Sequence, residues 1–105
     1  MLNLRAITLS NDDVEILADS LKNYMYLTHL DLSHNRIQGS RGGSAISKIL
    51  TRRMQDDHGG LDLEHLNLSN NKLGGFGCGE ILIELLNDGS KLDTLNLGYN
   101  SIEDF

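Results

Sequence analysis

An eleven-residue pattern that recurs along the chain constrains its fold more than any other feature of the sequence. Three segments of the 105-residue chain align without gaps and read L-x-x-L-x-L-x-x-N-x-[LI]: residues 27–37, 63–73 and 92–102. A degraded fourth copy opens the chain with the apolar residues Leu2, Leu4 and Leu9. Ile7 replaces its asparagine, which suggests that this copy lies at an edge or starts from a different register. Such self-similarity indicates stacked units that bury their apolar faces against one another.

The spacing within the pattern predicts a short parallel strand followed by a turn. In Leu30-Asp31-Leu32 and its equivalents the side chains alternate, so the leucines point into a core and the residue between them faces outward. The asparagine follows where the chain leaves the strand, and its amide can satisfy backbone groups there. Because a buried amide must be hydrogen-bonded, we expect a structural ladder formed by Asn35, Asn71 and Asn100.

Between the patterns, apolar residues recur at helical spacing. After the first copy, residues 10–13 offer capping and acidic side chains for a helix N-terminus, and Val14, Leu17, Ala18 and Leu21 then recur as on one helix face. Positions spaced by four residues align the three helices as Asp13, Leu17, Leu21, then Gly42, Ile46, Leu50, and then Gly77, Ile81, Leu85. Each unit is therefore predicted to run through strand, turn, helix and return.

The length of the units points to a known family. The separations between successive strand leucines are 28, 36 and 29 residues, counted along Leu2, Leu30, Leu66 and Leu95. Repeats of this length that carry a full helix resemble the ribonuclease-inhibitor-like subclass of leucine-rich-repeat proteins, which is intracellular. The resemblance covers nearly the whole chain. It implies an α/β leucine-rich-repeat solenoid of about 3.5 repeats, with a curved parallel sheet inside and helices outside.

We expect residues 1–105 to form one leucine-rich-repeat domain. Its repeats are residues 1–26, 27–62, 63–91 and a partial repeat, 92–105. The sequence stops just after its last strand, so the helix that would cover that repeat is missing. Because repeats of this kind contact only their neighbours and need capped ends, we expect either a longer array or another chain that covers the exposed end.

The second repeat is longer than its neighbours, and the alignment locates the surplus. The turn from Asn35 to Gly42 takes seven steps, one more than the equivalent turn of the third repeat, so one extra residue lies near Gly39. About six more lie within residues 51–60, a charged stretch that ends in two glycines. We expect an extended helix end and a protruding loop there. This loop is either a tolerated surface insertion or a partner-specific contact.

Charge and cysteine content argue against several classes of partner and favour one kind of compartment. Fifteen acidic and nine basic side chains give a net charge of −6, which argues against a nucleic-acid or anionic-membrane surface. No apolar run approaches the roughly 18–20 residues that span a bilayer, and the N-terminus lacks the apolar stretch of a secretion signal. The lone Cys78 cannot form an internal disulfide, which favours a reducing compartment. We therefore expect a cytoplasmic protein with no nucleic-acid or membrane partner.

The outward side chains of neighbouring strands are expected to gather on one surface. Parallel strands pack about 4.8 Å apart and helices about 8–10 Å apart, so the array must bend with its strands on the concave side. The candidate partner-binding residues on this concave face are His29, Asp31, Ser33, His65, Asn67, Ser69, Asn96 and Tyr99. Tyr99 is the expected anchor, because aromatic residues often dominate interfaces.

No pattern in the sequence predicts a catalytic, cofactor-binding or metal site. His29 and His65 occupy equivalent positions on neighbouring strands, but no carboxylate shares their row, so zinc binding is not expected. The glycine-rich stretch 74–79 is not followed by the lysine of a phosphate-binding loop. No base can be assigned to activate Cys78, which is expected to pack as a small apolar side chain.

These observations lead to the interpretation of the chain as a non-catalytic protein-interaction or scaffold module. The concave face is expected to bind the protein partner. The family resemblance leaves other roles open. One is a regulatory repeat like those of small-GTPase activators, another is the repeat region of an immune receptor, and a third is a fixed structural subunit of a large assembly such as a cilium.

Overall fold

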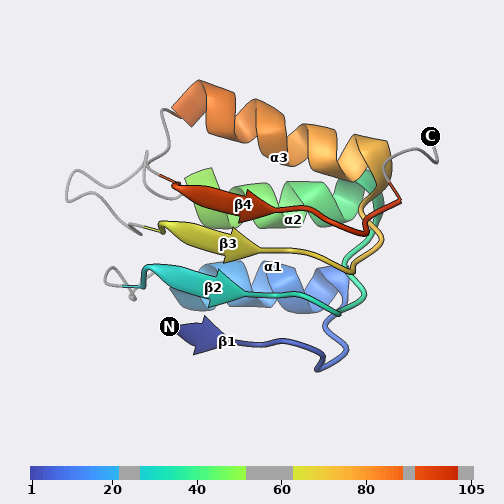
Figure 1. Ribbon diagram of the computed structural model, residues 1–105, viewed down its shortest axis with the longest axis horizontal. Helices are drawn as coiled ribbons and strands as arrows, with labels where there is room; N and C mark the ends of the chain where they lie inside the picture. Colours follow the sequence, from blue (N-terminus) through green and yellow to red (C-terminus); the bar gives the residue numbers. More distant parts are fainter. Residues whose placement is uncertain (22–26, 52–62, 89–91, 102–105) are drawn as a thin grey trace.

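The computed structural model describes residues 1–21, 27–51, 63–88 and 92–101 (Figure 1). Its elements in chain order are β1 (Leu2–Asn3), α1 (Asn11–Ser20), β2 (His29–Asp31), α2 (Gly39–Thr51), β3 (His65–Asn67), α3 (Gly74–Asp88) and β4 (Thr94–Asn96). Strands and helices thus alternate as the repeats predict. The predicted loop at 51–60 lies outside the described residues, apart from Thr51, at which α2 ends.

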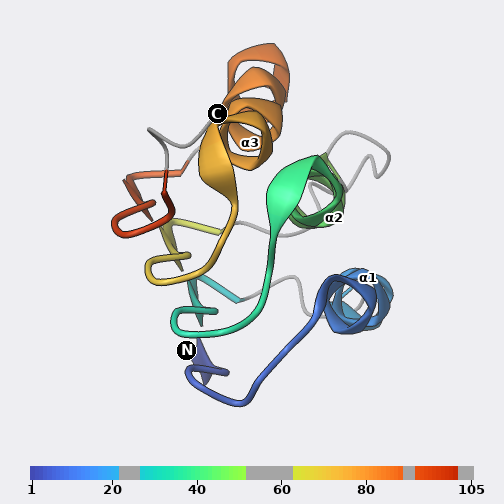
Figure 2. The same cartoon turned by 90° about the vertical axis from the view of Figure 1, so that its right-hand side faces the viewer.

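The four strands form one parallel sheet in chain order. Leu2 pairs with Leu30, Leu30 with Leu66, and Leu66 with Leu95, so equivalent positions of successive repeats lie in register. Figure 2 shows that α1, α2 and α3 all pack on the same side of this sheet. The predicted α/β solenoid, with strands on one side and helices on the other, is confirmed.

Alternation along the strands places the leucines of the pattern in the core. Leu30, Leu32, Leu66 and Leu68 are at most 2 % exposed. The helices complete the core with the side chains of Val14, Ala18, Ala45, Ile46, Ile49, Leu50, Cys78 and Ile81. Because burial of one large aliphatic side chain contributes roughly 1.5–3 kcal/mol, this single core holds the helices against the sheet.

Asparagine side chains join each repeat to the one before it. Asn71 Nδ2 donates to the Leu68 carbonyl of its own repeat at 2.9 Å and to the Leu32 carbonyl of the preceding repeat at 3.0 Å. Its Oδ1 accepts from the Ile37 N–H at 3.1 Å. Equivalent bonds are made by the other two buried asparagines, Asn35 and Asn100. Each amide thereby satisfies backbone groups that the turns would otherwise leave unpaired.

The opening repeat has Ile7 in place of the asparagine, and its turn is bonded by the asparagine of the second repeat. Asn35 reaches back to it: its Oδ1 accepts from the N–H groups of Ile7 and Leu9 at 3.1 and 2.9 Å. Asn35 Nδ2 also donates to the Leu4 carbonyl at 2.9 Å. The turn of the first repeat is therefore held by the second repeat.

Ser10 starts α1 as its N-cap. The Ser10 hydroxyl accepts from the Asp13 N–H at 3.3 Å, and Asp13 Oδ2 accepts from the Ser10 N–H at 2.9 Å, which together form a capping box. The backbone hydrogen bond from Ser10, followed by the bond from its hydroxyl, lowers the pKa of Asp13 below its ordinary value of 3.8. The side chains of Ser10 and Asp13 therefore cap the helix and do not pack in the core.

For this reason the predicted alignment of Asp13 with Gly42 and Gly77 is wrong. Asp13 is exposed, and the buried residues that open the three helices are Val14, Gly42 and Gly77. In this register the opening repeat has a turn as long as that of the second repeat, with Ser10 matching Gln38. The extra residue predicted near Gly39 is therefore Gln38, and the turn of the third repeat is one residue shorter than the turns of the first two.

Glycines let α2 and α3 approach each other closely. A Cβ atom added at Gly43 would lie 2.2 Å from the Gly77 carbonyl oxygen. A Cβ atom added at Gly77 would lie 2.5 Å from the Gly39 carbonyl oxygen. Both distances are far shorter than van der Waals contact, so a side chain at either position would push the two backbones apart. By contrast, the Cβ position of Gly79 on α3 has no heavy atom within 4 Å.

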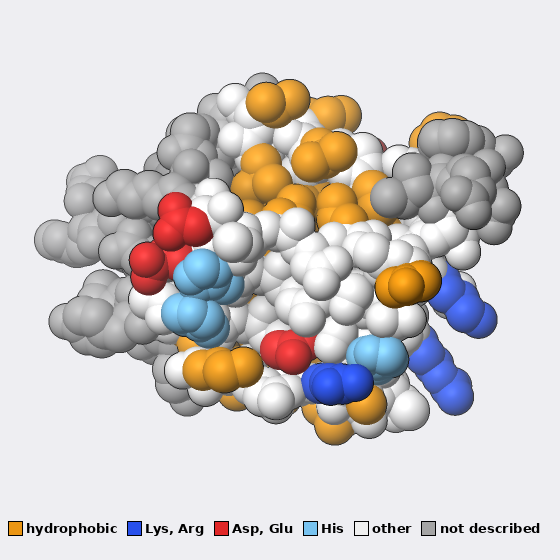
Figure 3. Space-filling view, viewed as in Figure 1, with side chains coloured by type: hydrophobic (Ala, Val, Ile, Leu, Met, Phe, Trp, Pro, Cys, Tyr) orange, Lys and Arg blue, Asp and Glu red, His pale blue; other side chains and the backbone are white. Residues whose placement is uncertain are grey.

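Apolar side chains gather on α3, at the end of the sheet formed by β4. Leu82, Ile83 and Leu86 are 46, 59 and 85 % exposed, and Figure 3 shows hydrophobic side chains along this upper part of the molecule. Leu95 and Leu97 of the last repeat are only partly buried. Within the described ranges no helix, α3 included, is long and apolar enough to cross a membrane. Coverage of this end by further repeats or another chain stays a prediction.

The close approach of α2 and α3 predicts different effects of two glycine substitutions on the free energy of unfolding. Gly43→Ala should lower the free energy of unfolding by about 1–3 kcal/mol, because the added methyl overpacks the contact with Gly77. The matched change Gly79→Ala, in open space on α3, should leave stability unchanged or raise it by up to about 1 kcal/mol. Urea unfolding followed by circular dichroism measures both, and equal stabilities of the two variants would contradict this packing.

Two asparagines should differ in their tolerance of a change to aspartate, because Asn71 belongs to the asparagine ladder and Asn96 lies outside it. Asn71→Asp should lower the free energy of unfolding by about 3 kcal/mol or more, because a carboxylate cannot donate to the two carbonyls that Asn71 holds. Asn96→Asp should change it by less than about 0.5 kcal/mol, because Asp31 already occupies the equivalent position of β2. Thermal unfolding of the two variants compares them. An unchanged stability of the Asn71→Asp variant would show that the ladder does not hold the turns.

Candidate functional site

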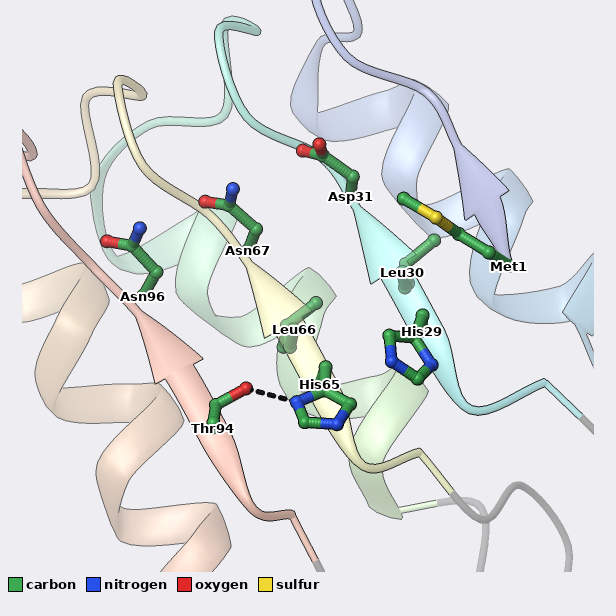
Figure 4. Close-up of a pocket in the computed structure, with 9 residues that line it drawn as sticks. All are labelled: Met1, His29, Leu30, Asp31, His65, Leu66, Asn67, Thr94 and Asn96. Atoms are coloured by element: carbon green, nitrogen blue, oxygen red, sulfur yellow. Dashed lines mark hydrogen bonds between the residues drawn. The ribbon is translucent and has the colours of Figure 1, made fainter.

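The side of the sheet opposite the helices carries the outward side chains of β2, β3 and β4. We call this surface the strand face and define it by His29, Asp31, His65, Asn67, Thr94 and Asn96 (Figure 4). A hollow of about 370 Å³ lies on it, and its lining also includes Met1, Leu30 and Leu66. Five predicted binding residues are brought together here: His29, Asp31, His65, Asn67 and Asn96.

His29 and His65 are register partners on β2 and β3. Their ring centroids lie 4.2 Å apart, with the ring planes tilted by 35°. His65 Nδ1 is hydrogen-bonded to Thr94 Oγ1 at 2.5 Å, and His29 Nδ1 to Thr28 Oγ1 at 2.9 Å. A threonine hydroxyl thereby orients each ring. The described residues hold no cluster of three or more His, Cys, Asp or Glu side chains that could bind a metal ion.

The central row of the strand face is held in one orientation by the backbone that follows it. Asn67 Oδ1 accepts from the Ser69 N–H at 3.0 Å, and Asn96 Oδ1 accepts from the N–H two residues later at 2.9 Å. Asp31 Oδ1 accepts from both the N–H and the hydroxyl of Ser33, at 2.9 and 2.6 Å. Bonds of this kind to the N–H two residues on define Asx turns. The orientation of each side chain in the row is therefore set by a bond to the chain's own backbone.

Ser33 and Ser69 lie below the accessible surface, contrary to the prediction that they line it. Their exposed fractions are 2 % and 8 %. The reason is that β2 and β3 end at Asp31 and Asn67, so the outward alternation of an extended strand stops there. The Asx turn then brings each serine beneath the row that it supports. These two residues leave the set of candidate contacts.

Tyr99 is 84 % exposed and lies outside the lining of the hollow, in the turn after β4. Its φ is +57°, and the equivalent residues His34 and Asn70 have the same value. Asparagine and histidine are enriched in this left-handed region, whereas a bulky residue is an outlier there. Among the residues at this position in the three repeats, tyrosine therefore carries the largest backbone strain. Such strain is a reason to suspect a role in function.

Met1 and Thr94 also line the hollow. The alternation of the strands places Thr94 in the row of His29 and His65 on this face, whereas Met1 is absent from the residues derived from sequence. Thr94 pairs in register with His65, so the third copy of the pattern already contains the signal for it. Met1 precedes Leu2, the register partner of Leu30, which aligns Met1 with the histidine row. This second signal is weak because the opening copy of the pattern is degraded.

Cys78 lies in the core near the start of α3, where it is 3 % exposed. Burial raises the pKa of its thiol above the ordinary value of 9.0. Since the thiolate is the nucleophilic form of cysteine, burial keeps this side chain unreactive. Its surroundings are those of a packing residue, as the sequence predicts.

Two segments of the chain match family models of the leucine-rich repeat. One match covers residues 25–47 and the other residues 62–86. Each segment holds one strand of the sheet and most of the helix that follows it. A search of curated proteins found no match. The two matches and the four-stranded parallel sheet together support the assignment of this chain as a leucine-rich-repeat protein.

Proposed function

We propose that the chain is a non-catalytic module that binds a protein partner through the strand face. Leucine-rich repeats generally act as protein-interaction modules, and repeat arrays use the extended face of the stack for this purpose. The observation that carries the proposal is the hollow of about 370 Å³ on the strand face. Its polar side chains stand on a parallel sheet whose register is fixed on both sides of the hollow.

The chemistry of this face suits recognition. Amide, hydroxyl and imidazole groups supply hydrogen bonds, and Asp31 supplies the carboxylate of the central row. The Asx turns hold Asn67 and Asn96 in place before binding. Because less conformational freedom is lost on association, such preorganisation increases affinity.

Tyr99 is proposed as an anchor at the edge of this surface. An exposed aromatic side chain can bury a large area in a partner while losing few rotatable bonds, which is why tyrosine is common among binding hot spots. The backbone at Tyr99 is held in the left-handed region, which is strained for a bulky residue. A role in binding would account for the backbone strain at Tyr99, which folding alone does not explain.

The class of partner and its location are part of the same proposal. The net charge of −6 supports a protein partner in preference to nucleic acid or an anionic membrane. Cys78 is buried, and the sequence has no second cysteine with which it could pair, which suits a reducing, cytoplasmic environment. The repeat lengths of 28 and 29 residues support the ribonuclease-inhibitor-like subclass.

One alternative role, that of a fixed structural subunit, has an observation in its favour. Leu82, Ile83 and Leu86 expose apolar surface on α3, and large apolar patches often mark permanent contacts. In that case the partner would be held by α3, and the strand face would contribute little. The two proposals therefore predict different sensitive residues.

Substitutions on the two surfaces should separate these proposals. With a partner captured from the source cell and then purified, Thr94→Arg should weaken binding by at least about tenfold, because a long cation would fill the hollow. Tyr99→Asn, which keeps a residue suited to the left-handed backbone, should also weaken it. Affinities are measured by isothermal titration calorimetry.

Two further variants complete the comparison. Ser44→Arg places the same side chain on an exposed position of α2 and should leave affinity unchanged. Leu86→Glu removes the most exposed leucine of α3 and should also leave it unchanged if the strand face is the site. Loss of binding with Leu86→Glu alone would overturn the proposal in favour of the structural-subunit role.

A further inference from the structure

We infer that the partner places a carboxylate side chain over Asn67 and Asn96 and a cationic side chain over Asp31. This inference rests on the proposed function, because it specifies the chemistry of the segment that the strand face binds. It follows from the direction in which the central row presents its donors and acceptors. The backbone sets that direction, independently of any partner.

The first step concerns the polarity of the two amides. Asn67 Oδ1 and Asn96 Oδ1 each accept a backbone N–H, at 3.0 and 2.9 Å. If either amide were turned by half a rotation, its NH₂ group would face that N–H, and two donors would oppose each other. The oxygen of each amide is therefore committed to the chain's own backbone. The NH₂ groups are the parts of these side chains that remain for a partner.

The second step concerns what those NH₂ groups meet. Within the described part of the chain, neither Asn67 Nδ2 nor Asn96 Nδ2 donates to a protein acceptor. Asn96 is exposed, Asn67 is partly so, and both line the hollow. Figure 4 shows the two amides side by side on β3 and β4. Neighbouring strands lie about 4.8 Å apart, so the four N–H donors form one compact group.

The third step selects the acceptor. A carboxylate offers about four lone-pair sites on two oxygens, so it can accept from both amides at once, and hydrogen bonds to a charged acceptor are about twice as strong as neutral ones. The central row carries no acidic side chain on β3 or β4, since its residues there are Asn67 and Asn96. Glu64 and Asp93 precede these strands and lie outside the row. A carboxylate between Asn67 and Asn96 would therefore meet donors. The acidic side chain of the row, Asp31, lies on the other side of Asn67, where the partner's cation would offset its charge.

The fourth step places the opposite charge. Asp31 Oδ1 accepts two bonds from Ser33, and among the described residues no side chain or N–H donates to Asp31 Oδ2. This oxygen is left for a cation of the partner. A carboxylate that bridges Asn67 and Asn96 lies about one and a half strand spacings, roughly 7 Å, from Asp31, and an extended chain advances about 3.3 Å per residue. The acidic and basic residues of a segment that crosses the strands should thus lie about two positions apart, which also places them on the same face of that segment.

A random-peptide library displayed on phage tests this pairing with the folded 105-residue chain as bait. The enriched peptides should contain an acidic and a basic residue about two positions apart. A selected peptide, synthesised and measured by fluorescence anisotropy, should bind Asn96→Asp at least about tenfold more weakly than the native chain. Gln38→Glu adds the same charge in the turn before α2, and binding to it should be unchanged.

The outcomes separate this inference from the proposed function. Peptides that lose affinity with Thr94→Arg but show no acid–base pairing, or that bind Asn96→Asp undiminished, would overturn the carboxylate assignment while leaving the strand face as the site. Peptides that bind Thr94→Arg as tightly as the native chain would overturn both. A library from which nothing is enriched would also count against both.

Discussion

The hydrogen bonds from each buried asparagine to the carbonyl of the preceding repeat are the interaction on which the rest of the structure depends. Asn71 bridges the Leu32 and Leu68 carbonyls and so sets where two neighbouring strands end relative to each other. Once this register is fixed, the leucines between must point into one core, and the residues between them must form a row on the opposite face. Without these bonds, buried backbone groups of two repeats would lose their partners.

The strand face inherits its chemistry from the same turns. Because the chain bends away directly after the row, the N–H two residues on is close enough to engage each row side chain, as Asn67 and Asn96 show. That bond occupies the one side-chain oxygen of an asparagine but only one of the two side-chain oxygens of an aspartate. A single difference in sequence, Asp31 in place of asparagine, therefore changes the exposed group from a donor to an acceptor. Recognition on this surface can be altered without altering the fold.

The sequence pattern was sufficient to predict the strands, their parallel order and the alternation of strand and helix, because these depend on periodicity that is visible in one dimension. It was insufficient where a contact between repeats decides the outcome. Ser33 is buried because the strand ends earlier than simple alternation assumes. Asp13 faces its cap and not the core. The approach of Gly43 to Gly77 joins helices far apart in sequence, and no local pattern marks it.

Hydroxyl-radical footprinting of the chain with and without its partner tests the central claim most directly, because readily oxidised side chains lie on both competing surfaces. We predict that the partner reduces oxidation of Met1, His29, His65 and Tyr99, which line the hollow or follow β4, while the exposed apolar side chains of α3 oxidise as before. Protection confined to those α3 side chains, with the strand face oxidised as in the free chain, would contradict the account.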